Sequence, residues 1–174
     1  GYLLSAKDFC MLPRLNDLIE AGVDAIKIEG RARRPFYVAI ATKYYRDKID
    51  GVERKLDDLK LAFNRGFTPG YFDGNANIIS FNSGHQGLKI GKIQKVIVGK
   101  KFNEVYIKTD YDLKPKSVLK IFRDEREIGS ISPYDVKKVD SLLYRLTTTG
   151  NNFKTGDTVN LLLDNEKEQR LETI

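Results

Sequence analysis

Residues 25–37 read AIKIEGRARRPFY, and this stretch decides how the first half of the chain is predicted to fold. The apolar run at residues 25–28 is short and bounded by a turn signal, which is typical of a buried strand. A charged turn follows from Glu29, and Pro35 stands where a helix accepts proline, in its first turn. We therefore predict a strand, a charged turn and a helix, in this order.

The charged turn is the first candidate for chemistry. In α/β folds, ligands bind beyond the carboxyl ends of the strands. Glu29 and Arg31 follow such an end directly, so we predict that they are catalytic residues. Arg33 and Arg34 lie in the same turn and are candidates for binding the substrate. On the residues alone, an ion pair that only ties down the loop explains the turn equally well.

Hydrophobic spacing places further elements on either side of this stretch. Upstream we expect a short strand over residues 2–4 and a helix that ends at Gly22, with apolar residues at Leu12, Leu15, Leu18 and Ile19. The helix from Pro35 is expected to end at Gly51 and to have an apolar face made of Val38, Ala41, Tyr45 and Ile49. A third helix is expected over residues 53–63.

The predicted order is strand, helix, strand, helix, helix. Two strands separated by a helix indicate parallel pairing with a right-handed crossover. Two strands alone make a poor parallel sheet, because such sheets need both faces covered. The chain also begins at Gly1 without a methionine, so we expect it to be a piece of a longer protein.

Residues 65–86 form a connecting loop that is rich in glycine and aromatic residues. The aromatic residues favour an ordered loop over a free linker, which rarely contains so many; they are Phe67, Tyr71, Phe72 and Phe81. Arg65, with Gly66 and Gly70, can contact phosphate, although glycine spacing alone is a weak signal. Arg65 is therefore a further candidate for binding the substrate.

From residue 87 the apolar residues alternate with period two, as in Val105 and Ile107, which predicts strands. Six short strands separated by turns indicate a small, closed or nearly closed, antiparallel β-barrel over residues 87–163. We expect the first strand pair to be broken at Gly91, and residues 164–174 to form a polar tail.

The charge is unevenly distributed over the 174 residues, a length that allows one or two domains. Lys and Arg outnumber Asp and Glu by 30 to 24, and between residues 89 and 120 there are nine basic and three acidic residues. Such a surplus marks either a polyanion-binding face or a solubilising strand surface. Under the first interpretation Lys89, Lys92 and Lys95 are candidates for binding RNA.

Several classes of protein are excluded by the composition. One cysteine cannot build an internal disulfide framework. No apolar run approaches the roughly 20 residues of a membrane span, and no signal-peptide pattern is present. We therefore expect no membrane contact.

Cys10 and His85 are the only residues of their types. Cys10 is either a small buried hydrophobe or a thiolate whose pKa is lowered by the start of a helix. His85 lies between glycines and is predicted to be a turn residue, so no Ser-His-Asp set can be assembled. No cluster of His or Cys offers a zinc site.

Four motifs give the chain a resemblance to the U32 peptidase family, the collagenase-like proteases. They occur in the family order: YLLSAKDFC at 2–10, KIEGR at 27–31, NRGFT at 64–68 and GHQG at 84–87. The departures are mild, since Ala6 replaces the usual proline and Arg33 and Arg34 replace a Lys-Ser pair. The resemblance implies an α/β plus all-β fold. Residues 1–64 would be the last βα units of a truncated TIM-like barrel, followed by the β-barrel.

The resemblance also implies an activity. The family is named for the degradation of collagen and gelatin, but several members resemble oxygen-independent hydroxylases that contain a 4Fe-4S cluster. These act on transfer RNA, ribosomal RNA or ubiquinone precursors, and some use prephenate as the oxygen source. Cys10 would then be one of four cluster ligands, with the other three in the missing upstream part.

The resemblance leaves three functions open. The chain would be the C-terminal fragment of a cytoplasmic, iron-sulfur-dependent hydroxylase that modifies an RNA base, and prephenate would be a co-substrate. The alternative is a collagenase-like protease with a protein substrate. The fragment by itself would be inactive, or an RNA-binding module without turnover. The sequence does not give the oligomeric state.

Overall fold

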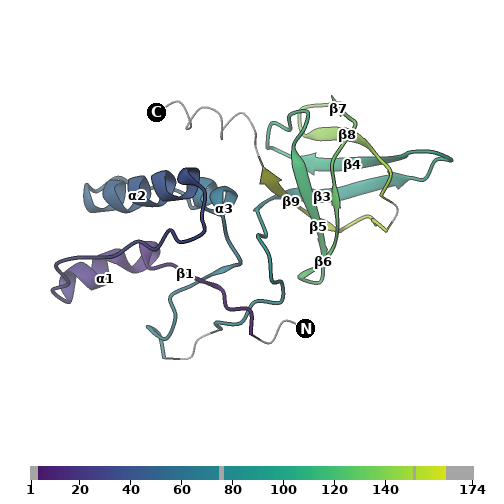
Figure 1. Ribbon diagram of the computed structural model, residues 1–174. Helices are drawn as coiled ribbons and strands as arrows, with labels where there is room; N and C mark the ends of the chain where they lie inside the picture. Colours follow the sequence, from purple (N-terminus) through teal and green to yellow (C-terminus); the bar gives the residue numbers. More distant parts are fainter. Residues whose placement is uncertain (1–3, 75–76, 151, 164–174) are drawn as a thin grey trace. The chain divides into compact units, whose positions relative to one another are not determined.

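A computed structural model describes residues 4–74, 77–150 and 152–163. The described residues divide into two compact units, one up to His85 and one from Gln86 onward (Figure 1). The predicted first strand falls mostly on residues 2–3, which lie outside the described residues, as does the predicted tail. We describe each unit by itself.

Unit 1 contains a 3-10 helix and three α-helices among its described residues. These are η1 (Leu12–Arg14), α1 (Leu15–Glu20), α2 (Pro35–Ile49) and α3 (Asp57–Ala62). The predicted start at Pro35 is confirmed, and the glycines at which two helices were predicted to end have positive φ angles, +80° at Gly22 and +78° at Gly51. The third helix is shorter than predicted and begins at Asp57.

The core of unit 1 lies along one side of α2. This helix buries Phe36, Ile40, Ala41 and Tyr44, which pack with Cys10, Leu12 and Leu59. The predicted apolar face is partly wrong, because Val38 and Ile49 are 41% and 47% exposed. Both sets of residues repeat at helical spacing, so the spacing alone could not decide which stripe the neighbouring segments cover.

The strand predicted at residues 25–28 is not formed, and no strand is present between residues 21 and 34. A strand requires a neighbour to which its backbone can hydrogen-bond, and none runs beside this segment within the described residues. The parallel pair of unit 1 is formed instead by β1 (Asp8–Phe9) and β2 (Phe67–Thr68). The TIM-like barrel units therefore stay a prediction.

Unit 2 is a seven-stranded antiparallel sheet, which Figure 1 shows curling round on itself. Its strand order is β6-β5-β9-β3-β4-β8-β7. The strands are β3 (Leu88–Ile97), β4 (Asn103–Thr109), β5 (Val118–Arg123), β6 (Arg126–Ile131), β7 (Asp135–Lys138), β8 (Leu143–Thr148) and β9 (Thr158–Leu163). Sequence alternation missed β7, because its four residues, DVKK, include a single apolar side chain.

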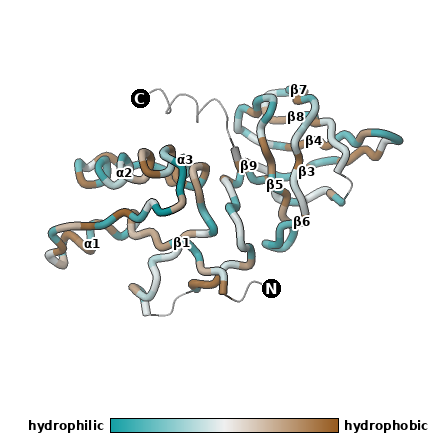
Figure 2. Tube along the Cα trace, in the orientation of Figure 1, coloured by the Kyte–Doolittle hydropathy of each residue, from teal (hydrophilic) through white to brown (hydrophobic). Residues whose placement is uncertain are grey.

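Alternation along the strands builds the core of unit 2. On β4, Val105 and Ile107 are fully buried, and Figure 2 shows apolar segments along the strands of this sheet. The predicted break at Gly91 is wrong, because β3 runs through this residue. A Cβ atom at Gly91 would lie 2.1 Å from the Lys108 carbonyl oxygen, so the glycine permits close approach of β4 and does not end the strand.

Candidate functional site

A pocket of about 480 Å³ in unit 1 brings together most of the predicted site residues. Its lining includes five of them: Cys10, Glu29, Arg31, Arg33 and Arg65. Arg34 is exposed and is not part of this lining. The three predicted RNA-binding lysines are exposed on β3 in unit 2: Lys89, Lys92 and Lys95.

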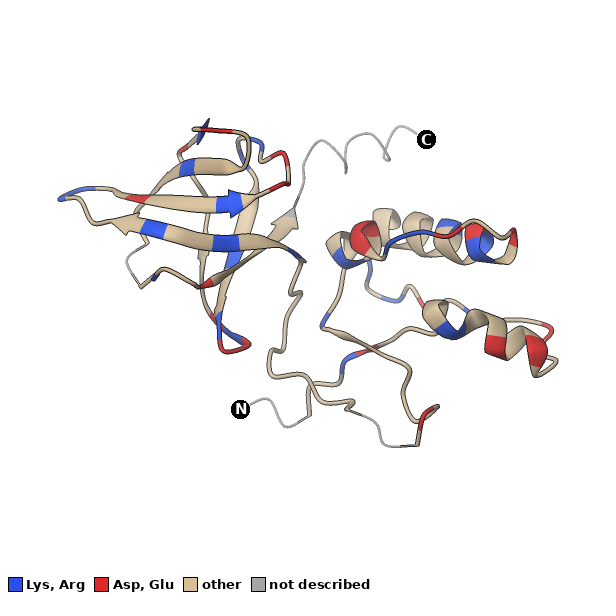
Figure 3. Cartoon of the chain, turned by 180° about the vertical axis from the view of Figure 1, so that it is seen from behind, with Lys and Arg blue, Asp and Glu red and all other residues tan. Residues whose placement is uncertain are grey.

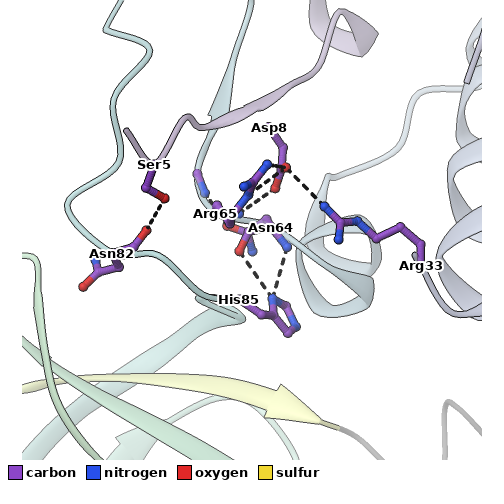
Figure 4. A network of polar contacts seen from close by, with 8 residues as sticks. Ser5, Asp8, Arg33, Asn64, Arg65, Asn82 and His85 are labelled. Carbon is purple, nitrogen blue, oxygen red and sulfur yellow. Dashed lines mark hydrogen bonds and ion pairs between the residues drawn. The ribbon is translucent and has the colours of Figure 1, made fainter. Parts of the chain in front are cut away.

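Asp8 contacts two of the arginines that line the pocket, and Figure 4 shows Arg33 and Arg65 pointing toward its carboxylate. Its carboxylate accepts hydrogen bonds from the Arg65 backbone N–H at 2.7 Å, from Nη2 at 2.8 Å and from Nε at 3.1 Å. Arg33 Nη2 lies 3.7 Å from the same carboxylate. Sequence reasoning missed Asp8, and the one available signal was a carboxylate two residues before Cys10.

His85 is a structural residue that closes the connecting loop. Its Nδ1 accepts the Asn64 backbone N–H at 3.1 Å, so Nε2 carries the proton and donates to the Leu61 carbonyl oxygen at 3.1 Å. The ring stacks on Phe63 with centroids 5.0 Å apart. The guanidinium carbon of Arg33 lies over the Phe63 ring, 3.7 Å from its centroid. Both ring nitrogens of His85 are therefore occupied by the backbone.

Glu29 and Arg31 do not form an ion pair with each other, but Arg33 of the same turn pairs with Asp8, which agrees with the alternative that an ion pair ties down the loop. Glu29 pairs with Lys27 at 2.8 Å, and both side chains are mostly exposed. Arg31 is exposed and has no ion pair within the part of the chain that the structure describes. Both residues line the pocket, so Arg31 is available to an anionic ligand.

Cys10 is both a core residue and part of the pocket lining, with 7% of its surface exposed. Burial raises the pKa of its thiol, and hydrogen bonds with the Leu12 backbone and the Tyr45 hydroxyl act in the opposite direction. Of the two alternatives for Cys10, the structure therefore agrees with the small buried hydrophobe and not with a thiolate whose pKa is lowered by a helix start. The Tyr45 hydroxyl also accepts the Met11 N–H at 3.1 Å, which fixes its position beside the thiol.

The 4Fe-4S cluster implied by the resemblance fits this site in one respect. Cluster sulfurs commonly accept hydrogen bonds, and Cys10 has two such partners. A cluster needs four ligands as a rule, and this chain has one cysteine, so three would come from elsewhere in the parent protein. Among the described residues no three His, Cys, Asp or Glu side chains gather to hold a metal ion.

The first 82 residues of the chain are similar to a known protein family. The described part of unit 1 defines a small helical unit with a cysteine- and arginine-lined pocket. Residues 1–82, slightly less than half of the 174 residues, match the profile of peptidase family U32, and this match, with the relatives below, supports membership of that family. No solved structure matches the chain.

Three relatives show which kinds of protein the chain is similar to. An uncharacterized protease of Methanocaldococcus jannaschii is 35% identical over 130 residues, covering 65% of this chain and 31% of its own length. A collagenase of Porphyromonas gingivalis is 36% identical over 83 residues, covering 42% and 23%. The 23S rRNA 5-hydroxycytidine C2501 synthase of Escherichia coli is 33% identical over 113 residues, covering 55% and 17%. The chain thus spans less than a third of each of these relatives.

No helix in the described part of the chain combines the length and the apolar character needed to cross a bilayer.

Proposed function

We propose that this chain is part of a cytoplasmic enzyme that hydroxylates a base in ribosomal or transfer RNA. The observation that carries the proposal is the composition of the unit 1 pocket, in which one cysteine lies with three arginines, Arg31, Arg33 and Arg65. Hydrolysis by a cysteine nucleophile needs a base within reach. The single histidine of the chain has both ring nitrogens bonded to the backbone at Leu61 and Asn64.

The sequence similarity to some relatives extends into unit 2. The alignment with the ribosomal RNA synthase covers 55% of 174 residues, about 96, and therefore extends beyond the first 85 residues into unit 2. The alignment with the collagenase covers 42%, about 73 residues, which is less than the length of unit 1. The alignment with the uncharacterized protease covers 65%, about 113 residues, and also extends into unit 2, so similarity in the basic sheet does not separate an RNA substrate from a protein substrate.

We assign a different role in the proposed reaction to each residue of the pocket. Cys10 would be one of the four ligands of a 4Fe-4S cluster. When bound, this cluster supplies electron transfer. Arg31 would bind an anionic group, a phosphate or the carboxylate of prephenate as co-substrate, because a guanidinium binds such groups in bidentate fashion. Asp8 holds Arg65 and orients Arg33 at the same pocket. Glu29 would orient the substrate at the exposed rim.

The test uses the full-length protein that contains this chain. Cys10→Ser should lose iron, measured per chain, together with the hydroxylated nucleoside, measured by mass spectrometry of its RNA. Met11→Leu is the matched control, because Met11 is 5% exposed and lines the same pocket. Normal iron content and turnover in the Cys10→Ser protein would mean that Cys10 is not a ligand of the cluster.

The alternative is a collagenase-like protease, which the similarity to the collagenase and to the uncharacterized protease favours. Gelatin digestion by the purified full-length protein, with the Arg31→Lys variant beside it, separates the two functions. Gelatin cleavage without any hydroxylated nucleoside would replace the proposed function by proteolysis. RNA binding without gelatin cleavage or RNA hydroxylation would mean that the protein is an RNA-binding module without turnover.

A further inference from the structure

A β-bulge places two lysines of β3 on one face of the sheet in unit 2. Residues three apart in a regular strand point to opposite faces. Lys92 is paired with Lys108 and Lys95 with Tyr106, so Gln94 is an extra residue between them. Such a bulge lets both lysines lie on the same side. Sequence spacing alone predicts the opposite arrangement.

This face is the outer one, and basic residues continue across it. On β4, Val105 and Ile107 are fully buried, which leaves Tyr106 and Lys108 on the other side. The register extends the row of Lys95 and Tyr106 to two further strands, through Arg145 on β8 and Lys137 on β7. We call this set the basic face; it consists of Lys92, Lys95, Lys108, Lys137, Arg145 and the central Tyr106. Figure 3 shows blue segments on these neighbouring strands.

The cations of the basic face are largely available. Lys92, Lys108 and Lys137 are exposed and have no ion pair within the described residues. The two nearby acids, Glu104 and Asp135, both contact Arg145, at 3.4 Å each. The Arg145 Nε atom is buried and has no hydrogen-bond partner within the described residues. Five cations against two acids leave a surplus of three positive charges for a polyanion.

Tyr106 distinguishes a nucleic acid from other polyanions. Its hydroxyl donates to Glu104 at 3.1 Å, which fixes the ring at the centre of the face. Lys95 Nζ lies 5.8 Å from the ring centroid. Aromatic rings between cations bind single strands, because bases stack on the ring while the cations contact the phosphates. An acidic peptide would use the cations and leave the ring without a role.

We propose that the basic face binds a single-stranded segment of RNA, with phosphates on Lys92, Lys108 and Lys137 and one base stacked on Tyr106. The identity of the polyanion as RNA rests on the proposed function. The binding surface itself rests on the register of the sheet.

The experiment measures binding of the full-length protein to a fluorescent single-stranded RNA of about 12 nucleotides at several salt concentrations. The Lys92→Gln/Lys108→Gln variant should reduce the slope of log K against log salt by about 1.4, two contacts at ~0.7 each. Tyr106→Leu should weaken binding about 5- to 100-fold, while Tyr106→Phe, which keeps the ring and loses only the bond to Glu104, should weaken binding by less than about 5-fold. The Lys43→Gln/Lys55→Gln variant removes the same charge from unit 1 and should leave the slope unchanged.

The outcomes separate the two proposals. Wild-type binding in both the lysine pair and the Tyr106→Leu variant would overturn the basic face, whether or not the enzyme modifies RNA. Loss of RNA binding in these variants, in a protein that hydroxylates no RNA base, would retain the basic face and overturn the proposed function. Equal competition by polyglutamate, together with normal binding by Tyr106→Leu, would assign the face to an acidic protein and also overturn the proposal.

Discussion

Asp157 and Arg123 form a salt bridge that links one residue pair to the acid stability of the sheet. Arg123 Nε and Nη2 each lie 2.8 Å from the carboxylate, which is 3% exposed and also accepts the Lys154 N–H at 2.7 Å. Burial raises the pKa of Asp157, but the hydrogen bonds and charges of Arg123 and Lys154 outweigh it and lower the pKa below the ordinary 3.8.

The sign of the pH dependence follows. Because the folded carboxylate has the lower pKa, the unfolded chain binds more protons in acid. The stabilisation is present above about pH 3.8 and is lost as the pH falls through the lower folded pKa. We expect the Tm, followed by circular dichroism, to fall steeply below pH 3.8, and Asp157→Asn to flatten that fall. Identical pH slopes for the two proteins would contradict this assignment.

A second prediction for a single residue concerns the contribution of Asp8 to the free energy of unfolding. Its side chain is 19% exposed and binds Arg65 through the backbone and the guanidinium. Asp8→Asn should lower the free energy of unfolding by about 1–3 kcal/mol, since the Arg65 guanidinium loses a charged acceptor at a partly buried position. Asp17→Asn is the control, because Asp17 pairs with Arg14 at 41% exposure and should cost below about 1 kcal/mol. Urea unfolding measures both, and equal losses would mean that Asp8 only ties down a surface loop.

At the scale of single elements, β4 shows most directly how sequence becomes structure. Ile107 is fully buried and Lys108, the next residue, is exposed. Ile107→Ala should cost about 2–4 kcal/mol through lost burial and a cavity. Lys108→Ala should change stability by less than about 0.5 kcal/mol. Denaturant unfolding of unit 2 tests the pair, and a similar cost for both would mean that the two faces of the strand are not distinguished.

The elements predicted well are those whose own side chains decide them. Period-two alternation located β4, and Pro35 located the start of α2. The strand at residues 25–28 failed because a strand depends on a partner, which the residues of the strand do not specify. Gly91 was misinterpreted for a related reason, since only the position of the Lys108 carbonyl shows that the glycine serves close approach.

For the whole molecule, the candidate site depends on contacts that no spacing reveals. The charged turn was found from local pattern and Cys10 from the resemblance to the U32 family. Cys10 and all of the predicted site residues of the turn except Arg34 line the pocket. Asp8 was missed because its partner Arg65 is 57 residues away in sequence. The basic face was underestimated because its arginine and its tyrosine come from strands other than β3.

The division into two units is also a prediction about the whole chain. His85 is bonded to unit 1 through Leu61, whereas the carbonyl oxygen of Gln86 accepts the Asn160 amide of unit 2 at 2.8 Å. We expect limited proteolysis to cut between Arg65 and Gly87 and to leave a resistant piece that begins near Gly84. Mass spectrometry identifies the piece. Cleavage spread evenly through this region and the strands of the sheet would contradict independent units.

The bulge at Gln94 also determines where the chain tolerates a change of length. Gln94 faces no residue of β4, so deleting it would make β3 regular and leave Lys92 and Lys95 opposite Lys108 and Tyr106. Deleting one residue of β4 has no such compensation and would turn every later side chain of that strand to the opposite face. Relatives that lack the residue at Gln94 are therefore expected to keep Lys92 and Lys95 on the same face of the sheet.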